Sequence, residues 1–427
     1  MREMKDSGVP WIGEIPKGWE LQRGKNILTL LERPVLDDDG VITCFRDGEV
    51  TLRSNRREDG FTFSIQEAGY QGIEPGDLVV HGMDGFAGAI GISDSRGKAT
   101  PVLNVLDSSQ SKRYLMYQMR TMAHCGLFFA LSSGIRVRSC DTNWNKLKVI
   151  NYIIPSLSEQ RRIADFLDSK CAEIDSILEQ TKESIEEYKK LKQSVITEAV
   201  TKGIRGERPM KDSGVEWIGE TPADWEVYPL KHLFVRRSQK NNPIVSTERL
   251  SLSIDVGITK YADKTTNLDR FKDDFSQYQL AYPDDIVLNS MNMIVGAVGK
   301  SPFFGCVSPV YYVIYPRSSA DVRYWSYLLN CMKIRDVYHS LGQGIYAIER
   351  GEGRVNTCRL KVPYDDFGRI MVSTPSYEEQ QEIAAYLDEK CAAIDSLIAS
   401  KEALITELEA YKKSLIYEYV TGKKEVV

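Results

Sequence analysis

The sequence has few of the residues that catalysis and metal binding commonly use. Its 427 residues include four histidines, His81, His124, His232 and His339, and none of these are spaced as metal ligands. The eight cysteines form no Cys-x-x-Cys pair, so we expect reduced and mostly buried thiols. No paired carboxylate motif supports acid–base chemistry. We therefore expect no catalytic residue and no metal site in this chain.

Long apolar runs are also missing. No stretch approaches the roughly 18 uncharged apolar residues that a membrane span needs. The first residues, Met1-Arg2-Glu3-Met4-Lys5-Asp6, contain no apolar segment of a secretory signal. These absences predict a cytoplasmic protein without membrane contact. The length, with 42% hydrophobic and 27% charged residues, is typical of two to four ordinary domains.

Positive charge is scarce for a nucleic-acid-binding protein, because such a protein neutralises phosphates with Lys and Arg. The net charge is −5, but it is unevenly distributed. Residues 20–154 carry 16 basic and 16 acidic side chains, and residues 226–374 carry 19 and 15. The acidic excess lies in 155–225 and 375–427. Any DNA affinity must therefore come from shaped surfaces more than from bulk charge.

An internal repeat is the most informative feature of the sequence. The segment 4–14, Met-Lys-Asp-Ser-Gly-Val-Pro-Trp-Ile-Gly-Glu, returns at 210–220 with one substitution, at an offset of 206. A second pair of matching segments begins at Pro155 and Pro375, at an offset of 220, so the second intervening block is 14 residues longer. The repeat predicts six segments: 1–19 and 210–225 as repeated motifs, 20–154 and 226–374 as variable blocks, and 155–209 and 375–427 as long helices.

Two long helices are predicted after the two prolines. Ser156 and Ser376 are followed three residues later by glutamate, the capping-box pattern in which side chains satisfy free amides of the first turn. No Gly or Pro interrupts 157–202 or 377–421, and a glycine follows each segment, as expected at a helix end.

Heptad spacing predicts that these helices pair as a coiled coil. The candidate seam positions alternate spacings of four and three: Leu397, Lys401, Leu404, Leu408, Tyr411 and Leu415 in the second helix, and Ile177, Thr181, Ser184, Tyr188, Leu191 and Val195 in the first. With one helix closing each half, we expect antiparallel pairing with approximate twofold symmetry and the variable blocks at opposite ends. The alternative is two helices that pack in separate domains.

The variable blocks read as mixed α/β or mostly β domains with a common fold. Alternating β-branched runs occur at 77–81 and 89–92, and again at 285–289 and 297–299, at an offset of 208. Between them the sequences diverge, with Gly-Met-Asp-Gly-Phe at 82–86 against Ser-Met-Asn-Met-Ile at 290–294. A shared scaffold with divergent loops suits two recognition modules for different targets.

The paired motifs and the two-unit layout together resemble the specificity subunit of type I restriction-modification systems. The motifs are Asp-Ser-Gly through Trp-Ile-Gly at 6–13, Pro-Lys-Gly-Trp at 16–19 and Pro-x-x-x-Glu-Gln at 155 and 375. The resemblance implies an α+β fold of two target recognition domains, each reading one half of a split double-stranded DNA sequence, joined by an antiparallel coiled coil that sets the gap. One departure is that Gly351-Glu352-Gly353-Arg354 and Tyr364-Asp365-Asp366 have no counterpart in the first block.

The resemblance also implies partners. Two methyltransferase subunits would dock on the conserved regions, and ATP-driven motor nuclease subunits would cleave DNA. S-adenosylmethionine, ATP and Mg are then expected on those subunits and no cofactor on this chain. Trp11 and Trp217 are candidate docking residues, although we favour a packing role for both against the helix ends.

Candidate DNA contacts follow from the chemistry of base edges. Arg suits guanine, Asn and Gln suit adenine, and Asp or Glu accepts from cytosine. The candidates are Arg53, Arg56, Arg57, His81, Asp84, Arg136 and Arg138 in the first block, and Asn289, Asn292, Tyr346, Arg350 and Arg354 in the second. For each residue alone, an ordinary solvated or structural side chain remains the alternative.

Two other classes of function remain to be weighed. A coiled-coil scaffold that binds proteins and no DNA would not need two strongly diverged copies of one block. An enzyme with its site between the blocks would need reactive residues at matching positions, and the repeat offers none. The glycine-rich segment 85–91 lacks the spacing of a dinucleotide fingerprint and reads as a turn between strands.

Overall fold

A computed structural model of the chain describes residues 2–56, 68–131, 142–254, 257–264, 274–344 and 360–426. The chain forms two compact units. The first unit comprises Met1–Lys182 and Lys401–Val427, and the second comprises Glu183–Ser400. Each unit therefore contains one variable block together with part of each long helix.

The first unit is built on short antiparallel strands. The strands are β1 (Met4–Asp6), β2 (Glu14–Pro16), β3 (Glu20–Arg23), β4 (Thr29–Leu30), β5 (Ile42–Cys44), β6 (Val50–Leu52), β7 (Gln71–Ile73), β8 (Leu78–His81), β9 (Ile90–Ile92), β10 (Gly97–Ala99), β11 (Leu103–Asp107) and β12 (Asn151–Ile154). Its short helices are α1 (Gly24–Ile27), α2 (Lys112–His124), α3 (Leu127–Ala130) and α4 (Trp144–Leu147), with 3-10 turns η1 (Arg53–Asn55) and η2 (Gly85–Ala87).

The second unit repeats this plan. Its strands are β13 (Met210–Asp212), β14 (Glu220–Pro222), β15 (Glu226–Pro229), β16 (Phe234–Arg236), β17 (Leu250–Ser253), β18 (Gly257–Lys260), β19 (Gln279–Ala281), β20 (Ile286–Asn289), β21 (Val298–Lys300), β22 (Gly305–Val307), β23 (Tyr311–Pro316) and β24 (Met371–Thr374). Its helices are α6 (Leu230–Leu233), α7 (Tyr261–Lys264), α8 (Val322–Leu328), α9 (Met332–Leu341) and α10 (Tyr364–Arg369), with 3-10 turns η4 (Phe275–Gln277) and η5 (Met293–Val295).

The same four-stranded antiparallel sheet lies at the centre of both units. Its order is β4-β11-β8-β9 in the first unit and β16-β23-β20-β21 in the second. The strands predicted at 77–81, 89–92, 285–289 and 297–299 are confirmed as β8, β9, β20 and β21. The glycine-rich segment 85–91 forms the turn between β8 and β9, as its sequence indicated. The two blocks therefore share a fold, and the predicted α+β class is confirmed.

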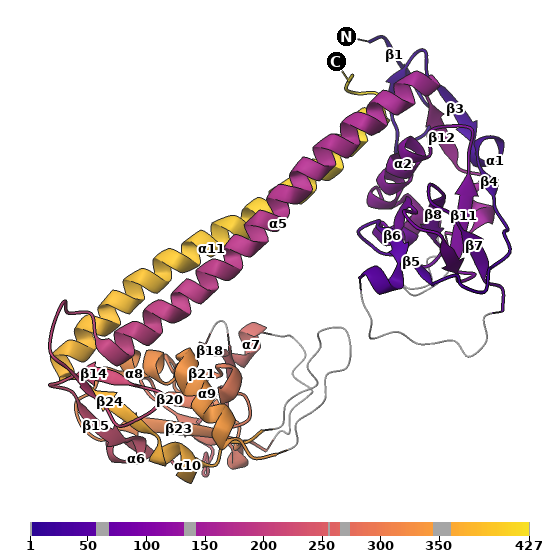
Figure 1. Ribbon diagram of the computed structural model, residues 1–427. Helices are drawn as coiled ribbons and strands as arrows, with labels where there is room; N and C mark the ends of the chain where they lie inside the picture. The colour runs from indigo at the N-terminus through magenta and orange to yellow at the C-terminus, as the bar shows by residue number, and fades with distance from the viewer. Residues whose placement is uncertain are drawn as a thin grey trace. The chain divides into compact units, whose positions relative to one another are not determined.

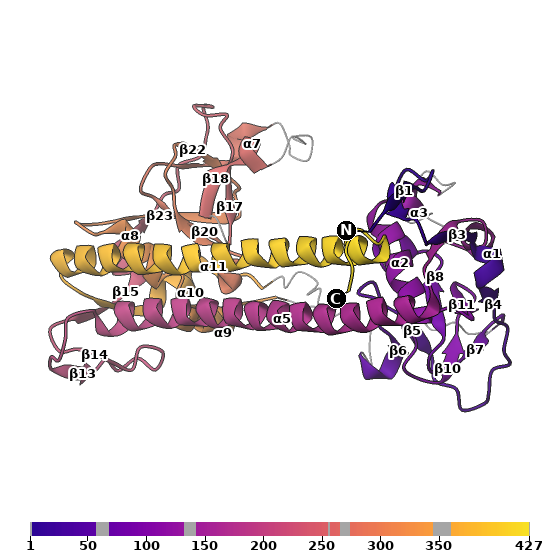
Figure 2. The same ribbon diagram turned by 90° about the horizontal axis from the view of Figure 1, so that it is seen from above.

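The two long helices are α5 (Leu157–Lys202) and α11 (Tyr377–Val420), and they match the predicted ranges closely. Within each unit the two helix segments lie side by side (Figures 1 and 2). Lys412 Nζ is 2.6 Å from Asp175 Oδ1 in the first unit, and Lys192 Nζ is 2.7 Å from Asp395 Oδ2 in the second. Because a late residue of one helix contacts an early residue of the other each time, the pairing is antiparallel.

The seam between the helices differs in part from its prediction. Seven predicted positions are buried or half-buried, as expected: Thr181, Ser184, Tyr188, Val195, Lys401, Leu408 and Leu415. The other five are exposed: Ile177, Leu191, Leu397, Leu404 and Tyr411. The residues that turn inward instead are one position later, at 178, 185, 192, 398, 405 and 412. Apolar residues such as Leu397-Ile398 and Leu404-Ile405 occupy both phases. The buried start of each helix, with Leu387, Cys391 and Ile394 in α11, selects the second phase.

The predicted capping box is also only half correct. Ser156 Oγ accepts from the Glu159 amide at 3.3 Å, and Ser376 Oγ accepts from the Glu379 amide at 3.2 Å. The glutamate side chains do not complete the box, because they bind tryptophans of the repeated motifs. Trp19 Nε1 donates to Glu159 Oε2 at 3.0 Å, and Trp225 Nε1 donates to Glu379 Oε2 at 2.9 Å.

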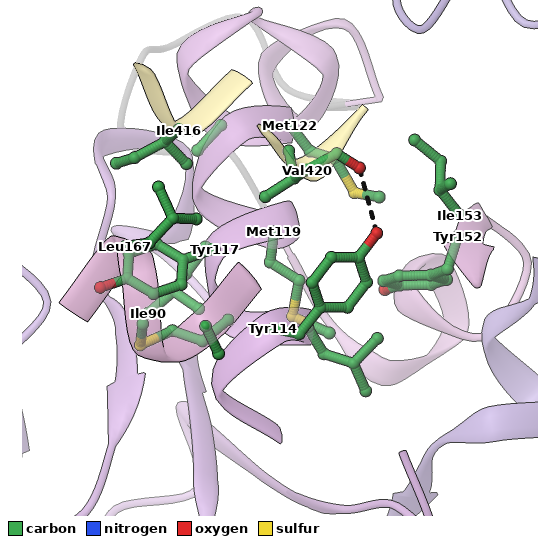
Figure 3. Packing of buried hydrophobic residues seen from close by; sticks show 14 of the residues in the cluster. Ile90, Tyr114, Tyr117, Met119, Met122, Tyr152, Ile153, Leu167, Ile416 and Val420 are labelled. Atoms are coloured by element: carbon green, nitrogen blue, oxygen red, sulfur yellow. Dashed lines mark hydrogen bonds between the residues drawn. The ribbon is translucent and has the colours of Figure 1, made fainter. Parts of the chain in front are cut away.

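A continuous core joins each globular part to the helices. In the first unit the cluster includes Ile90, Met119 and Tyr152 of the globular part, Leu167 of α5 and Val420 of α11 (Figure 3). The hydroxyl of Tyr114, buried in the same cluster, donates to the Val420 carbonyl at 3.0 Å (Figure 3). In the second unit the Tyr324 hydroxyl donates to the Val200 carbonyl at 3.4 Å. Each globular part therefore packs against the start of one long helix and the end of the other.

The described cysteines are free thiols, as predicted, and Cys125 is the exposed one among them. Burial raises the pKa of Cys44 to about 12 and that of Cys306 to about 11. Within the described ranges no cluster of three His, Cys, Asp or Glu side chains could hold a metal ion. No described helix is both long and apolar enough to span a membrane.

Candidate nucleic-acid interface

The loops that leave β8 and β20 have the same backbone geometry. Asp84 O accepts from the amides of Ala87 and Ala89 at 2.9 and 3.3 Å. Asn292 O accepts from Val295 and Ala297 at 3.1 and 3.0 Å. Each loop contains a 3-10 turn and then a glycine of positive φ, Gly88 at 98° and Gly296 at 101°, a conformation that suits glycine. We call residues 81–88 and 289–296 the recognition loops.

His81 and Asn289, both candidate DNA contacts, begin these loops and support them. His81 Nδ1 accepts from the amides of Met83 and Asp84 at 3.2 and 3.0 Å. Asn289 Oδ1 accepts from the Met291 amide at 3.1 Å. Burial lowers the pKa of His81, and Asp84 acts to raise it. Because Nδ1 accepts from two amides, the proton of the neutral ring lies on Nε2. Within the described part of the chain, His81 Nε2 and the Asn289 amide nitrogen have no hydrogen-bond partner; His81 is half-buried and Asn289 is buried.

Asp84 and Asn292 occupy the same position in the two loops and differ in chemistry. Asp84 is half-buried, and its Oδ1 accepts from Arg46 Nη2 at 2.8 Å. Asn292 is exposed. A carboxylate offers acceptors only, whereas an amide offers a donor and an acceptor side by side. The matching positions can therefore bind different base edges.

Arg53 and Arg56, the remaining described candidates of the first block, follow β6. Arg56 Nη2 lies 2.6 Å from Asp47 Oδ2, and its guanidinium stacks 4.2 Å from the Phe45 ring. Asp47 belongs to the same β5–β6 turn as Arg46, so Arg56 and Asp84 both contact this turn. Arg53 Nε donates to Thr43 Oγ1 at 3.4 Å. The structure thus brings Asp84 and Arg56 to one corner of the unit.

A further pair of equivalent contacts closes each recognition loop from the side. The Thr142 amide donates to Gly82 O at 2.7 Å, and the Val362 amide donates to Ser290 O at 3.0 Å. Thr142 O accepts from Asn104 Nδ2 at 3.0 Å, while Val362 O accepts from the Tyr312 hydroxyl at 2.8 Å. The same frame is held by different side chains in the two units.

The other candidates, Arg57, Arg136, Arg138, Tyr346, Arg350 and Arg354, lie outside the described residues. One sequence-based statement needs correction. Tyr364-Asp365-Asp366 has a counterpart in the first block, because it opens α10 where Trp144-Asn145-Lys146 opens α4 at an offset of 220. The sequences hide this match because both short helices begin with unrelated residues.

Arg236 is a further candidate that sequence reasoning missed. Its guanidinium lies 5.0 Å from the Tyr312 ring and 4.9 Å from the Tyr364 ring. The residue is exposed, and no described carboxylate forms an ion pair with it. Tyr312 in turn contacts Val362 beside the second recognition loop. An exposed cation stacked against two neighbouring aromatic rings is a suitable contact for a phosphate or a guanine edge.

Trp11 and Trp217, the candidate docking residues, are half-buried. Trp11 packs against the core of the first unit. Trp217 packs against the core of the second, and its Nε1 donates to Met371 O at 3.0 Å. Trp217 also borders a cavity of about 550 Å³ between the repeated motif and α9, with Val215, Lys333 and Val337. These contacts support the packing role, and partner docking stays a prediction.

Comparison with known proteins shows relatives over nearly the whole chain. A protein of Methanocaldococcus jannaschii assigned as a candidate MjaX type I restriction enzyme specificity subunit is 24% identical over 97% of this chain and 96% of its own length. The MjaVIII type I restriction enzyme specificity subunit of the same organism is 25% identical over 64% of this chain and 62% of its own. No protein-family model matches the chain.

Solved structures share the fold. A chain from a type I R-M system studied for its complex assembly and conformational transition aligns with a TM-score of 0.66, at 14% identity, over 96% of this chain and 99% of its own. The HsdS subunit of Thermoanaerobacter tengcongensis aligns with a TM-score of 0.51, at 14% identity, over 96% and 98%. The chain is thus homologous to type I restriction enzyme specificity subunits and has the fold of a solved HsdS subunit.

Proposed function

We propose that this homologue of type I specificity subunits recognises a bipartite double-stranded DNA sequence and performs no bond chemistry itself. Each variable block reads one half of the target. The coiled coil sets the length of the unspecified gap. Partner subunits, directed by this recognition, methylate adenine in each half and cleave DNA.

One observation carries this proposal beyond homology. The two recognition loops share their backbone hydrogen bonds, yet they present different polar side chains at matching positions, Asp84 against Asn292 and His81 against Asn289. A scaffold that only bound proteins would have no reason to keep the loop frame and change the polar groups along it. Two domains that each recognise a different half-site need a common loop backbone that carries different polar side chains.

The chemistry of the two loops suggests what each could read. An amide such as that of Asn292 can pair with N6 and N7 of adenine in the major groove. A carboxylate can accept from the N4 amino group of cytosine, and arginine can donate to O6 and N7 of guanine. The adjacent Arg46 and Asp84 therefore offer one donor group and one acceptor group for a G·C pair.

Affinity must come from contacts to the phosphates, because base contacts mainly give specificity. Arg236 and the exposed Lys361 beside the second recognition loop are suitable cations. Two methyltransferase subunits would hold S-adenosylmethionine, and motor nuclease subunits would hold ATP and Mg. Trp11 and Trp217 lie in the repeated motifs on which the methyltransferases would dock.

The proposal is tested by co-expressing the chain with a type I methyltransferase subunit and mapping modified adenines across a genome by single-molecule sequencing. We expect a split motif with a fixed gap. A complex that forms but modifies no split motif would contradict the proposal and favour the protein-binding scaffold.

A further inference from the structure

The recognition loops share one exposed residue, a methionine. Met83 is 47% exposed and Met291 is 39% exposed, at an offset of 208. The neighbouring positions carry different residues. His81, Gly82 and Asp84 in the first loop correspond to Asn289, Ser290 and Asn292 in the second. Large apolar side chains are costly to leave in water, so the same exposed methionine in two otherwise divergent loops requires an explanation.

Both methionines are held in the same way by different chemistry. The Met83 amide donates to His81 Nδ1 at 3.2 Å, and the Met291 amide donates to Asn289 Oδ1 at 3.1 Å. In each loop the side chain two residues earlier therefore fixes the backbone that carries the methionine. The supporting residue has changed between the units, and the presentation of the methionine has not.

A valine accompanies each methionine. Val102 is 36% exposed, and its carbonyl accepts from the Gly82 amide at 2.8 Å. Val310 is 44% exposed, and its carbonyl accepts from Ser290 Oγ at 2.7 Å. Each valine thus lies directly beside the residue before the methionine. The pairs Met83–Val102 and Met291–Val310, which we call the apolar pairs, lie next to Asp84 and Asn292, the groups that differ between the loops.

The internal comparison separates two kinds of contact. Residues that differ between the loops suit the bases that differ between the half-sites. Residues that are the same suit a feature that both half-sites contain. If partner subunits methylate an adenine in each half, as the proposed function has it, both halves contain an A·T pair. Its thymine presents a C5-methyl group in the major groove, the apolar feature that side chains contact there.

We infer that each apolar pair contacts the methyl group of the thymine opposite the adenine to be modified. The inference rests on the proposed function and adds a specificity contact to it. Met83 and Val102 would serve one half-site, and Met291 and Val310 the other. Methionine suits this contact because its unbranched thioether chain adapts its shape to an apolar partner.

The test uses the complex with its methyltransferase and a duplex that carries the mapped motif. Deoxyuridine, which lacks the methyl group, replaces the thymine opposite the modified adenine in one half at a time. Dissociation constants are measured for the unchanged chain, Met83→Ala and Met291→Ala. For the unchanged chain we expect about fourfold weaker binding with uracil in either half, the effect of one methyl group removed from water.

Each variant provides the control for the other. Met83→Ala should lose the difference between thymine and uracil in one half and keep it in the other, which shows that the complex is still folded. Met291→Ala should show the opposite pattern. Equal binding of thymine and uracil duplexes by the unchanged chain, or a difference that survives in both variants, would overturn the inference alone. A complex that binds no mapped duplex more tightly than random DNA would overturn the proposed function and the inference with it.

Discussion

The two units agree where the globular part meets the long helices and differ at the far ends of β8 and β20. Trp19 binds Glu159 in the first unit, as Trp225 binds Glu379 in the second. The Tyr117 hydroxyl donates to Asp168 at 2.7 Å, and the Tyr327 hydroxyl donates to Asp388 at 2.9 Å. The repeated sequence motifs supply most of these contacts.

The recognition loops, by contrast, share a backbone and few side chains. The repeated positions therefore fix each block to the helices, while the divergent loop positions can change without loss of that attachment. Buried anchors resist change because a lost partner leaves a polar group unsatisfied. Exposed loop residues carry no such penalty.

The anchors themselves are not equally buried, and this predicts the largest effect. Glu379 is almost fully buried with Arg208, whose Nε and Nη2 have no hydrogen-bond partner among the described residues, whereas Glu159 and its partner Arg2 are more accessible. Glu379→Ala should lower the free energy of unfolding by about 3–5 kcal/mol, because it leaves a buried cation unpaired.

Chemical denaturation followed by tryptophan fluorescence measures this effect. Glu159→Ala should lower the free energy of unfolding less than Glu379→Ala does. The control is Glu382→Ala, which is on the same helix as Glu379 and removes an exposed ion pair with Arg205. It should lower the free energy of unfolding by under about 0.5 kcal/mol. Equal losses for Glu159→Ala and Glu379→Ala would mean that the two anchors do not differ in the way their burial indicates.

The phase of the helix seam gives the next largest effect. Leu178 is buried in the core of the first unit, whereas its neighbour Ile177 is exposed. Leu178→Ala should therefore cost about 2–4 kcal/mol, and Ile177→Ala under about 1 kcal/mol. Thermal denaturation of the two variants compares adjacent positions of one helix. If Ile177→Ala were the more harmful change, the seam predicted from the sequence alone would be correct.

Arg236 has no equivalent in the first unit, because Leu30 occupies the matching position on β4. Arg236→Ala should weaken DNA binding about fivefold for all duplexes and reduce the salt slope of log K by about one, as loss of one phosphate contact would. Arg369→Ala, which removes another exposed arginine, is the control. A change of base preference without a change of salt slope would assign Arg236 to base reading instead.

The smallest effect concerns pH. Burial lowers the pKa of His81, so the unfolded chain binds a proton more readily than the folded one as the pH falls through about 6.5. Stability of the first unit should decline from that point down to the lowered pKa. His81→Asn copies the support found at Asn289 and should remove this decline while the loop is kept. Hydrogen exchange of the Asp84 amide, measured between pH 5 and 8, would show this decline in stability. An unchanged pH dependence in His81→Asn would exclude His81 as its source.

Local patterns predicted much of this fold from the sequence. The helices end at Lys202 and Val420, directly or nearly before the glycines that marked their ends. The repeat predicted two similar domains because the motifs, strands and helices of the first half recur in the same order in the second, at offsets of 206 to 220. These signals lie within a few residues of the features they specify.

Contacts between distant residues could not be predicted in this way. Glu159 reads as a capping residue until Trp19, 140 positions away, is placed against it. Which residues form the seam between the helices depends on which set of positions the globular core buries. Both candidate sets contain apolar residues. Arg236 looks like any surface arginine until the paired rings of Tyr312 and Tyr364 are brought against it. The recognition loops were found from strand patterns, but the roles of His81 and Asn289 within them required the fold.

The claim that the variable blocks recognise the target while the repeated motifs hold them on the helices is tested most directly with a chain that has two copies of one variable block. Residues 226–374 are replaced by a second copy of residues 20–154, and all repeated motifs and helices are kept. The modified sites are then mapped in cells that express the methyltransferase. We expect a split target whose two halves are inverted copies of each other, with one half of the original motif retained. A motif that kept both original halves would contradict the claim, because recognition would then lie outside the variable blocks.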